Sequence, residues 1–151
     1  MVNLNEIYQE IILDHYRKPR NYAELPGANR RASGHNPLCG DKVTVYLQVE
    51  DGVVKDVTFQ GAGCAISTAS ASLMTETIKG KSVEEADAVF RRFHDMVTVG
   101  EGAGEGDLGK LEALAGVRQI PIRVKCATLV WHTMKAALLS EQEIAEAVST
   151  E

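Results

Sequence analysis

The sequence KVTVYLQVEDGVVKDVTFQG, residues 42–61, decides the fold class of this chain. Apolar and polar residues alternate along it on both sides of Asp51-Gly52, which is the pattern of two half-buried β-strands. Asp-Gly is favoured in two-residue hairpin turns, because both turn positions adopt a positive φ. The stretch therefore predicts an antiparallel β-hairpin.

Helical patterns lie on both sides of the hairpin. Residues 4–12 carry apolar side chains at helical spacing, Asn3 and Glu6 form a capping box, and Pro19 ends this first helix. Beyond the hairpin the sequence predicts, in chain order, a helix of small residues from Cys64 to Gly80, a helix capped by Ser82 and Glu85, a short helix near 108–115, a long helix after Pro121, and a short terminal helix capped by Ser140 and Glu143.

These elements together predict an α+β fold. Residues 20–37 indicate a loop with one short strand, so the sheet consists of the hairpin plus a short third strand, packed against helices. No internal repeat and no domain boundary interrupts the sequence, and we expect residues 1–151 to form a single domain.

Composition and charge exclude several classes of protein. The chain has 151 residues and a net charge of −5, which argues against binding to nucleic acid. One modest basic cluster is either a solvated loop or a surface that docks an acidic protein; it comprises Arg17, Lys18, Arg20, Arg30 and Arg31. Neither a membrane-spanning apolar run nor a signal peptide is visible, and we expect a cytoplasmic location.

Three widely separated cysteines are the main candidates for metal binding or thiol chemistry. Cys39 precedes the hairpin and Cys64 follows it, so the antiparallel register brings their positions to one edge of the sheet. Cys126 lies near the start of the last long helix, and only tertiary folding can bring it to the same place. At a helix N-terminus the dipole favours the thiolate, which is the form that binds metal.

Asp41, two residues after Cys39, adds a carboxylate to the three thiols. Three thiolates and one carboxylate match the four ligands of a tetrahedral zinc ion. Each cysteine taken alone is as readily explained as a small buried apolar residue. The flanking glycines, the helix-start positions and the aspartate favour a shared site.

In their order behind the hairpin, CGD at 39–41, GAGCAIS at 61–67 and RVKCATLVWHTMKAAL at 123–138 resemble the iron–sulfur cluster assembly proteins of the IscU/NifU/SufU family. The opening IYQEIILDHYRKPRNY, residues 7–22, resembles the first helix of that family. The resemblance covers nearly the whole chain and implies an IscU-like fold.

Two departures from the scaffold members are similar to the SufU branch. Lys125 stands where scaffold members usually carry a histidine, and the chaperone-recruiting LPPVK segment is replaced by IPIRVK at 120–125. The interval of 62 residues between Cys64 and Cys126 is also longer than in the scaffold branch. The resemblance implies a zinc-dependent sulfurtransferase, hence an enzyme, that works with a SufS-type cysteine desulfurase and downstream Suf assembly proteins.

The resemblance assigns roles to individual residues. Cys39, Asp41, Cys64 and Cys126 correspond to the zinc ligands. Cys39 is the expected sulfur acceptor, freed when a histidine of the desulfurase replaces it on zinc, and Cys126 is the competing acceptor. Arg123, one helical turn before Cys126, either steadies a thiolate, contacts the partner or is a solvated surface arginine.

Two other functions remain open from the sequence. The same four residues could hold a [2Fe–2S] cluster on an assembly scaffold, or a structural zinc ion with no role in transfer. Three of the four histidines are not expected to take part in these sites: His15 and His94 are typical of ordinary helix positions, and His132 lies on a different helix face from Cys126.

Overall fold

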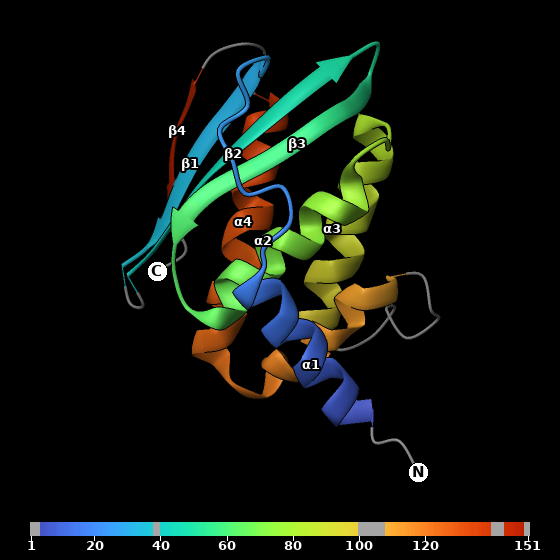
Figure 1. The fold of residues 1–151 in the computed structure, drawn as a ribbon, viewed down its shortest axis with the longest axis vertical. Coiled ribbons are helices and arrows are strands. Elements are labelled where there is room, and N and C mark those ends of the chain that lie inside the picture. The colour runs from blue at the N-terminus through green and yellow to red at the C-terminus, as the bar shows by residue number, and fades with distance from the viewer. Residues whose placement is uncertain (1–3, 38–39, 100–107, 140–143, 150–151) are drawn as a thin grey trace.

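The computed structural model describes residues 4–37, 40–99, 108–139 and 144–149. Its sheet has the strand order β3-β2-β1-β4 (Figure 1). The strands are β1 (Arg30–Asn36), β2 (Asp41–Glu50), β3 (Val53–Ala62) and β4 (Ile144–Ser149). The pairs β1–β2 and β2–β3 are antiparallel, so the hairpin and the third strand predicted from the sequence are confirmed.

The hairpin turn forms for the reason that the sequence predicts. Asp51 has a φ of 53° and Gly52 a φ of 74°, and Glu50 pairs with Val53 across the two-residue loop. Two consecutive positive φ values match the right-handed twist of the flanking strands. Asp51 can adopt this conformation because aspartate tolerates the left-handed region better than most residues.

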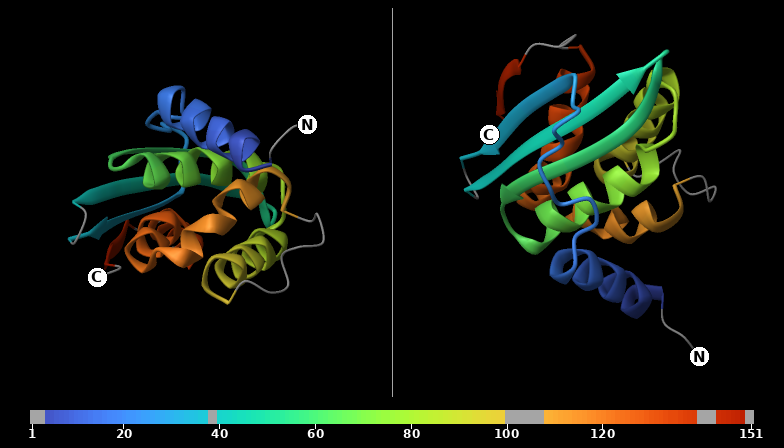
Figure 2. Two further views of the ribbon diagram at one scale, coloured as in Figure 1. Left: turned by 90° about the horizontal axis from the view of Figure 1, so that it is seen from below. Right: turned by 45° about the horizontal axis from the view of Figure 1, so that its top comes forward.

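Helices cover one face of the sheet. They are α1 (Leu4–Arg17), α2 (Ala65–Ile78), α3 (Val83–Thr98), the 3-10 helix η1 (Gly109–Gln119) and α4 (Pro121–Leu139). α4 packs against β1 and β2, while α2 packs against β3 and α4 (Figure 2). α1 lies on α2 and η1, and α3 lies on η1 and α4, so the core is shared between the sheet and the helices.

The sequence-based prediction of a terminal helix is wrong. Ile144–Ser149 forms the strand β4, which pairs in parallel with β1 between Arg31 and His35. An edge strand offers unpaired backbone N–H and C=O groups, and the end of the chain satisfies those of β1. The proposed capping residues Ser140 and Glu143 lie outside the described residues, as does Asn3 of the first capping box.

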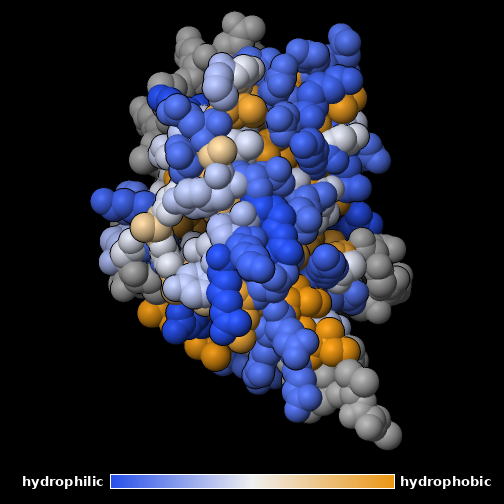
Figure 3. All heavy atoms as spheres, viewed as in Figure 1, coloured by the Kyte–Doolittle hydropathy of each residue, from blue (hydrophilic) through white to orange (hydrophobic). Residues whose placement is uncertain are grey.

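The surface in the view of Figure 1 is mostly hydrophilic, with apolar side chains exposed mainly toward the end that carries α1 (Figure 3). Ile7 and Leu13 of α1 are among the exposed apolar residues. Within the described ranges, no helix combines the length and the hydrophobicity needed to cross a membrane.

Candidate metal centre

Asp41 is fixed at the edge of the sheet where β2 begins and β3 ends. Lys42 pairs with Ala62, so Asp41 lies beside the segment that leaves β3 for α2. Its side chain is fully buried, and its Oδ1 accepts a hydrogen bond of 2.9 Å from the backbone N–H of Cys64. Gly63 makes this approach possible, because a Cβ atom there would lie 2.7 Å from Asp41 Oδ1.

Cys64 is the N-cap of α2, at the strand-to-helix junction expected from the sequence. Its backbone is extended, with φ −71° and ψ 172°, and its sulfur accepts a hydrogen bond from the backbone N–H of Ser67 at 3.5 Å. The Sγ atom lies 4.0 Å from Asp41 Oδ2. The N-terminus of α2 thus presents a backbone N–H group to this sulfur. The residue is half-buried.

Cys126 enters the group through tertiary packing. It is fully buried on α4, a helix that packs against α2 and β2. Its position is five residues beyond Pro121, past the first turn, so the helix dipole acts on it less than on Cys64. The sulfur atoms of Cys64 and Cys126 and a carboxylate oxygen of Asp41 lie within 4.8 Å of one another.

The donor atoms suit a zinc ion. Zinc binds sulfur at about 2.3 Å and carboxylate oxygen at about 2.0–2.2 Å, so neighbouring ligand atoms in a tetrahedral site are roughly 3.5–3.8 Å apart. The observed spread of up to 4.8 Å needs only a small contraction to meet this value. Among the residues that the structure describes, no other group of three histidine, cysteine or acidic side chains is as compact.

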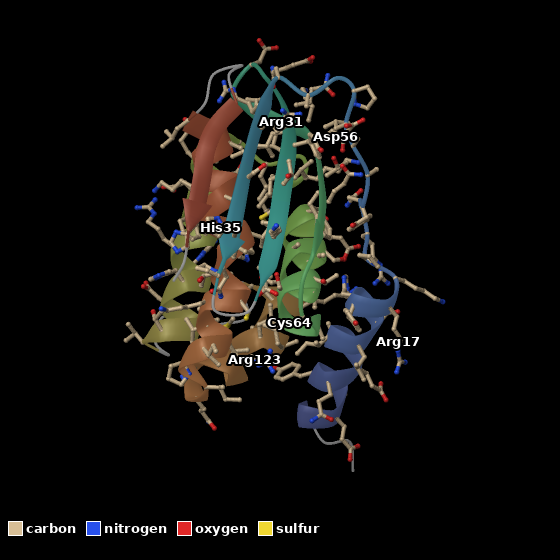
Figure 4. All side chains as sticks on the ribbon, turned by 90° about the vertical axis from the view of Figure 1, so that its left-hand side faces the viewer. Arg17, Arg31, His35, Asp56, Cys64 and Arg123 are labelled. Carbon is tan, nitrogen blue, oxygen red and sulfur yellow. The ribbon has the colours of Figure 1, made fainter. Side chains whose placement is uncertain are left out.

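Arg123 lies against the two sulfur atoms. Figure 4 shows Arg123 and Cys64 close together at the end of the sheet. The negative charge of the Cys64 thiolate raises the pKa of the Arg123 guanidinium above its ordinary value, together with a hydrogen bond to that sulfur and a weaker contribution from Cys126. The residue singled out by its place one turn before Cys126 is therefore brought to the thiols, as an exposed cation.

Cys39, the fourth ligand expected from the sequence, lies outside the described residues.

The basic cluster noted in the sequence has a different outcome. The basic cluster is dispersed: Arg17 and Arg31 are at separate places on the molecule (Figure 4), and Arg20 forms an ion pair of 2.6 Å with Asp14. It therefore does not form one continuous docking surface.

Sequence reasoning missed the supporting role of the backbone at this site. The N–H groups of Cys64 and Ser67 hold the Asp41 carboxylate and the Cys64 sulfur, respectively. A signal for the second contact was present, because an N-cap side chain commonly accepts from the backbone three residues later. The first contact depends on the Asp41–Gly63 proximity, which only the strand register reveals.

The fold and the site belong to a known family. Residues 7–127 match the family described as the NifU-like N terminal domain, and the chain is a member of it. A solved structure from Fervidobacterium islandicum AW-1, described as a candidate iron–sulfur cluster assembly scaffold protein for the SUF system, superposes with a TM-score of 0.81 at 35% identity, covering 90% of this chain and 99% of that one. The expected IscU-like fold is thus confirmed.

Curated relatives carry two different names. The chain is 41% identical over 140 residues to the zinc-dependent sulfurtransferase SufU of Bacillus subtilis, covering 93% of this chain and 95% of that protein. It is 44% identical over 132 residues to the iron–sulfur cluster assembly scaffold protein IscU of Thermotoga maritima, covering 87% and 92%. Sequence identity therefore establishes the family and does not separate the two branches.

Proposed function

We propose that this chain is a zinc-dependent sulfurtransferase that accepts sulfur from the persulfide of a SufS-type cysteine desulfurase and passes it on to iron–sulfur cluster assembly. The observation that carries the proposal is the convergence of Asp41, Cys64 and Cys126, from three separate elements, with Arg123 beside the two sulfur atoms. The chain is similar, over nearly the full length of both proteins, to a relative that is named as the zinc-dependent sulfurtransferase SufU, and this similarity supports the same function.

Cys39 completes the proposed ligand set. One residue, Gly40, separates it from Asp41, so the two Cα atoms are at most about 7.6 Å apart whatever the conformation between them. With Asp41, Cys64 and Cys126 it supplies the four ligands that zinc requires. Bound zinc supplies charge that keeps these thiols deprotonated at neutral pH.

Cys39 is also the proposed acceptor. Its thiolate attacks the outer sulfur of the desulfurase persulfide, the S–S bond breaks, and the electron pair leaves with the desulfurase cysteine as a thiolate. The new persulfide on Cys39 replaces the old one, so no oxidant or reductant is consumed. The competing acceptor Cys126 is fully buried, which makes a direct encounter with a donor on another protein difficult.

We propose that Arg123 compensates the negative charge of the metal site. Three thiolates and a carboxylate around a divalent ion carry a net negative charge, and the exposed guanidinium lies next to two of the sulfurs. An arginine keeps its charge at all physiological pH values and can contact two anions at once. We expect it to stabilise the thiolates while the acceptor thiolate is engaged with the donor.

The second candidate is a scaffold that builds a [2Fe–2S] cluster on the same residues. Relatives named as scaffolds, at 44% and 39% identity, support it. Three cysteines and an aspartate also suit iron, since cluster ligands are mostly thiolates. Lys125 in place of a histidine and the long interval from Cys64 to Cys126 favour the sulfurtransferase over the scaffold.

One experiment separates the two functions. The purified, zinc-loaded chain is added to a SufS-type desulfurase with cysteine and without iron, and alanine formation is followed. A large rise in turnover that is lost in Cys39→Ala supports the sulfurtransferase and identifies the acceptor; loss in Cys126→Ala with retention in Cys39→Ala assigns the acceptor to Cys126. No rise, together with a coloured cluster formed when iron and sulfide are supplied, supports the scaffold.

A further inference from the structure

Two histidines that are 38 positions apart in the sequence meet on the helical side of the molecule. His94 lies on α3 and His132 on α4, and these helices run side by side (Figure 2). The centroids of the two imidazole rings are 5.8 Å apart, with an angle of 79° between the ring planes. Both side chains are half-buried.

The surrounding side chains hold this pair in place. Phe90 contacts both rings, with centroid distances of 6.1 Å to His94 and 5.2 Å to His132. One turn further along α3, Phe93 stacks on Trp131 of α4 at 4.7 Å. The contacts of Phe90 with His132 and of Phe93 with Trp131 thus tie α3 to α4 beside the histidines, and a ligand between the rings would not need to order the two helices first.

A surface hollow opens at the histidine pair. Its volume is about 310 Å³, and Phe90, Arg91, His94, Asp95 and His132 line it. The Asp95 side chain is exposed, so its carboxylate is free to turn toward the rings. The cationic neighbours are partly neutralised, because Asp87 forms ion pairs with Arg91 at 3.3 Å and with Lys135 at 3.1 Å.

The protonation state of His132 suits metal binding. Burial lowers the pKa of His132 below its ordinary value of 6.5, and the charges of His94 and Lys135 act in the same direction. The His132 ring is therefore neutral at pH 7, and a neutral imidazole is the form that ligates metal ions.

We propose that His94 and His132 form a second metal site, which binds a borderline divalent cation such as Zn²⁺, Ni²⁺ or Cu²⁺. Two imidazoles bound to one such ion at about 2.0–2.1 Å place their ring centroids roughly 5–6.5 Å apart, which includes the observed 5.8 Å. Water and the Asp95 carboxylate fill the remaining positions. Imidazole suits these metals, whereas Mg²⁺ and Ca²⁺ prefer oxygen ligands.

This site is separate from the cysteine group. His132 follows Cys126 by six residues, which is about 9 Å along the axis of α4. The two sites share no residue, and they differ in ligand type: thiolates bind zinc more tightly than a pair of imidazoles does. We therefore expect two zinc ions per chain at saturation, of which the second binds more weakly.

The test counts zinc ions. The full chain, loaded with one equivalent of Zn²⁺, is dialysed against rising Zn²⁺ concentrations, and bound metal is measured by mass spectrometry of the dialysed protein. We expect a second equivalent to bind to the wild type, and His94→Gln or His132→Gln to weaken that event by about tenfold or more, since each variant removes one arm of a chelate. His35→Gln, which alters a histidine on β1 outside this hollow, should bind both equivalents.

A second measurement is made on the wild-type protein, so that its result does not depend on whether a variant folds. In the wild-type protein, addition of the second equivalent should shift the imidazole ¹H–¹⁵N signals of His94 and His132 together and leave those of His35 in place. The proposal is wrong if the second equivalent binds to His94→Gln as tightly as to the wild type, or if the two rings do not respond. Desulfurase stimulation does not enter this test, so its outcome is independent of the proposed function.

Discussion

At the scale of single residues, Asp41 serves two purposes with one carboxylate. Its Oδ1 accepts the Cys64 N–H at 2.9 Å, and its Oδ2 lies 4.0 Å from the Cys64 sulfur. The first oxygen fixes the strand-to-helix junction, which leaves the second directed at the thiols. A buried carboxylate gains from a nearby cation, because burial removes the water that would otherwise solvate its charge.

The first prediction separates this carboxylate from a surface one. We expect Asp41→Asn to retain zinc about tenfold less tightly or worse after dialysis against a chelator, because the amide keeps the shape and the acceptor oxygen but loses the charge. Asp51→Asn is the matched control: it removes the same charge in the hairpin turn, and asparagine tolerates the positive φ of 53°. Equal zinc retention in the two variants would rule out Asp41 as a ligand.

The second prediction concerns Gly63. A methyl group at this position would lie 2.7 Å from Asp41 Oδ1 and 3.1 Å from Ser67 Oγ, so Gly63→Ala must displace the carboxylate. We expect zinc retention to fall by about tenfold or more, as when other supporting residues of a metal site are altered, while the far-ultraviolet circular dichroism is unchanged.

Gly116→Ala provides the control for this change. A Cβ atom at Gly116 meets nothing within 4 Å, so the same substitution introduces no contact there. Retention of zinc by Gly63→Ala at the wild-type level would show that the position of the carboxylate is not critical to the site.

At the scale of elements, the docking of α1 on α2 depends on a buried histidine. The His15 side chain is 1% exposed, its Nδ1 atom is 2.7 Å from Ser72 Oγ, and its Nε2 atom is 3.6 Å from Glu76. The backbone N–H of Arg20 also donates to Ser72 Oγ, at 2.8 Å. The end of α1 and the following segment are therefore joined to α2 at one serine.

The third prediction is a pH dependence that comes from this contact. Burial lowers the pKa of His15 below 6.5, aided by the charges of Arg20 and Lys110 and opposed by those of Glu76 and Asp14. The folded protein then binds the proton less readily than the unfolded chain. We expect the free energy of unfolding to decrease as the pH falls below about 6.5, and this group to add no dependence above that pH.

Denaturant unfolding between pH 5.5 and 8 measures this effect. His15→Gln should lose the part of the pH dependence that belongs to the ring, whereas His35→Gln should keep it. Parallel pH profiles for His15→Gln and the wild type would show that His15 does not link α1 docking to pH.

At the scale of the whole molecule, the features that the sequence predicted are those that local patterns determine. The hairpin followed from alternation and from Asp51-Gly52, and the capping box of Ser82 and Glu85 is present at the start of α3 as expected. These features depend on contacts between residues close in the sequence. The family resemblance extended the prediction to the fold and to the residues of the site.

What the sequence did not predict depends on distant contacts. The strand β4 is formed by pairing with β1, which is more than 100 residues earlier in the chain, and local propensity did not indicate it. The meeting of His94 and His132 likewise depends on how α3 packs against α4, and each position looks ordinary within its own helix. The sequence favoured a shared site that includes Cys126 from its place near a helix start and from the family resemblance, but the packing of α4 on α2 and β2 that brings it there is not visible in local patterns.

The last prediction follows from the distribution of the proposed ligands over β2, the start of α2, and α4. A metal ion bound by residues from these elements binds the folded chain and not the unfolded one, so it stabilises the whole fold. At a free zinc concentration 100 times the dissociation constant, the gain is about 2.7 kcal/mol, which corresponds to a rise in Tm of roughly 5–10 °C for a chain of this size. Thermal unfolding of the zinc-loaded and chelator-stripped protein measures it. We expect Asp41→Asn to reduce the rise sharply, and His94→Gln to preserve it at one equivalent of zinc, because the cysteine group binds first. A rise of the same size in Asp41→Asn would mean that zinc stabilises the fold from another place. The assignment of Asp41, Cys64 and Cys126 as zinc ligands would then be wrong.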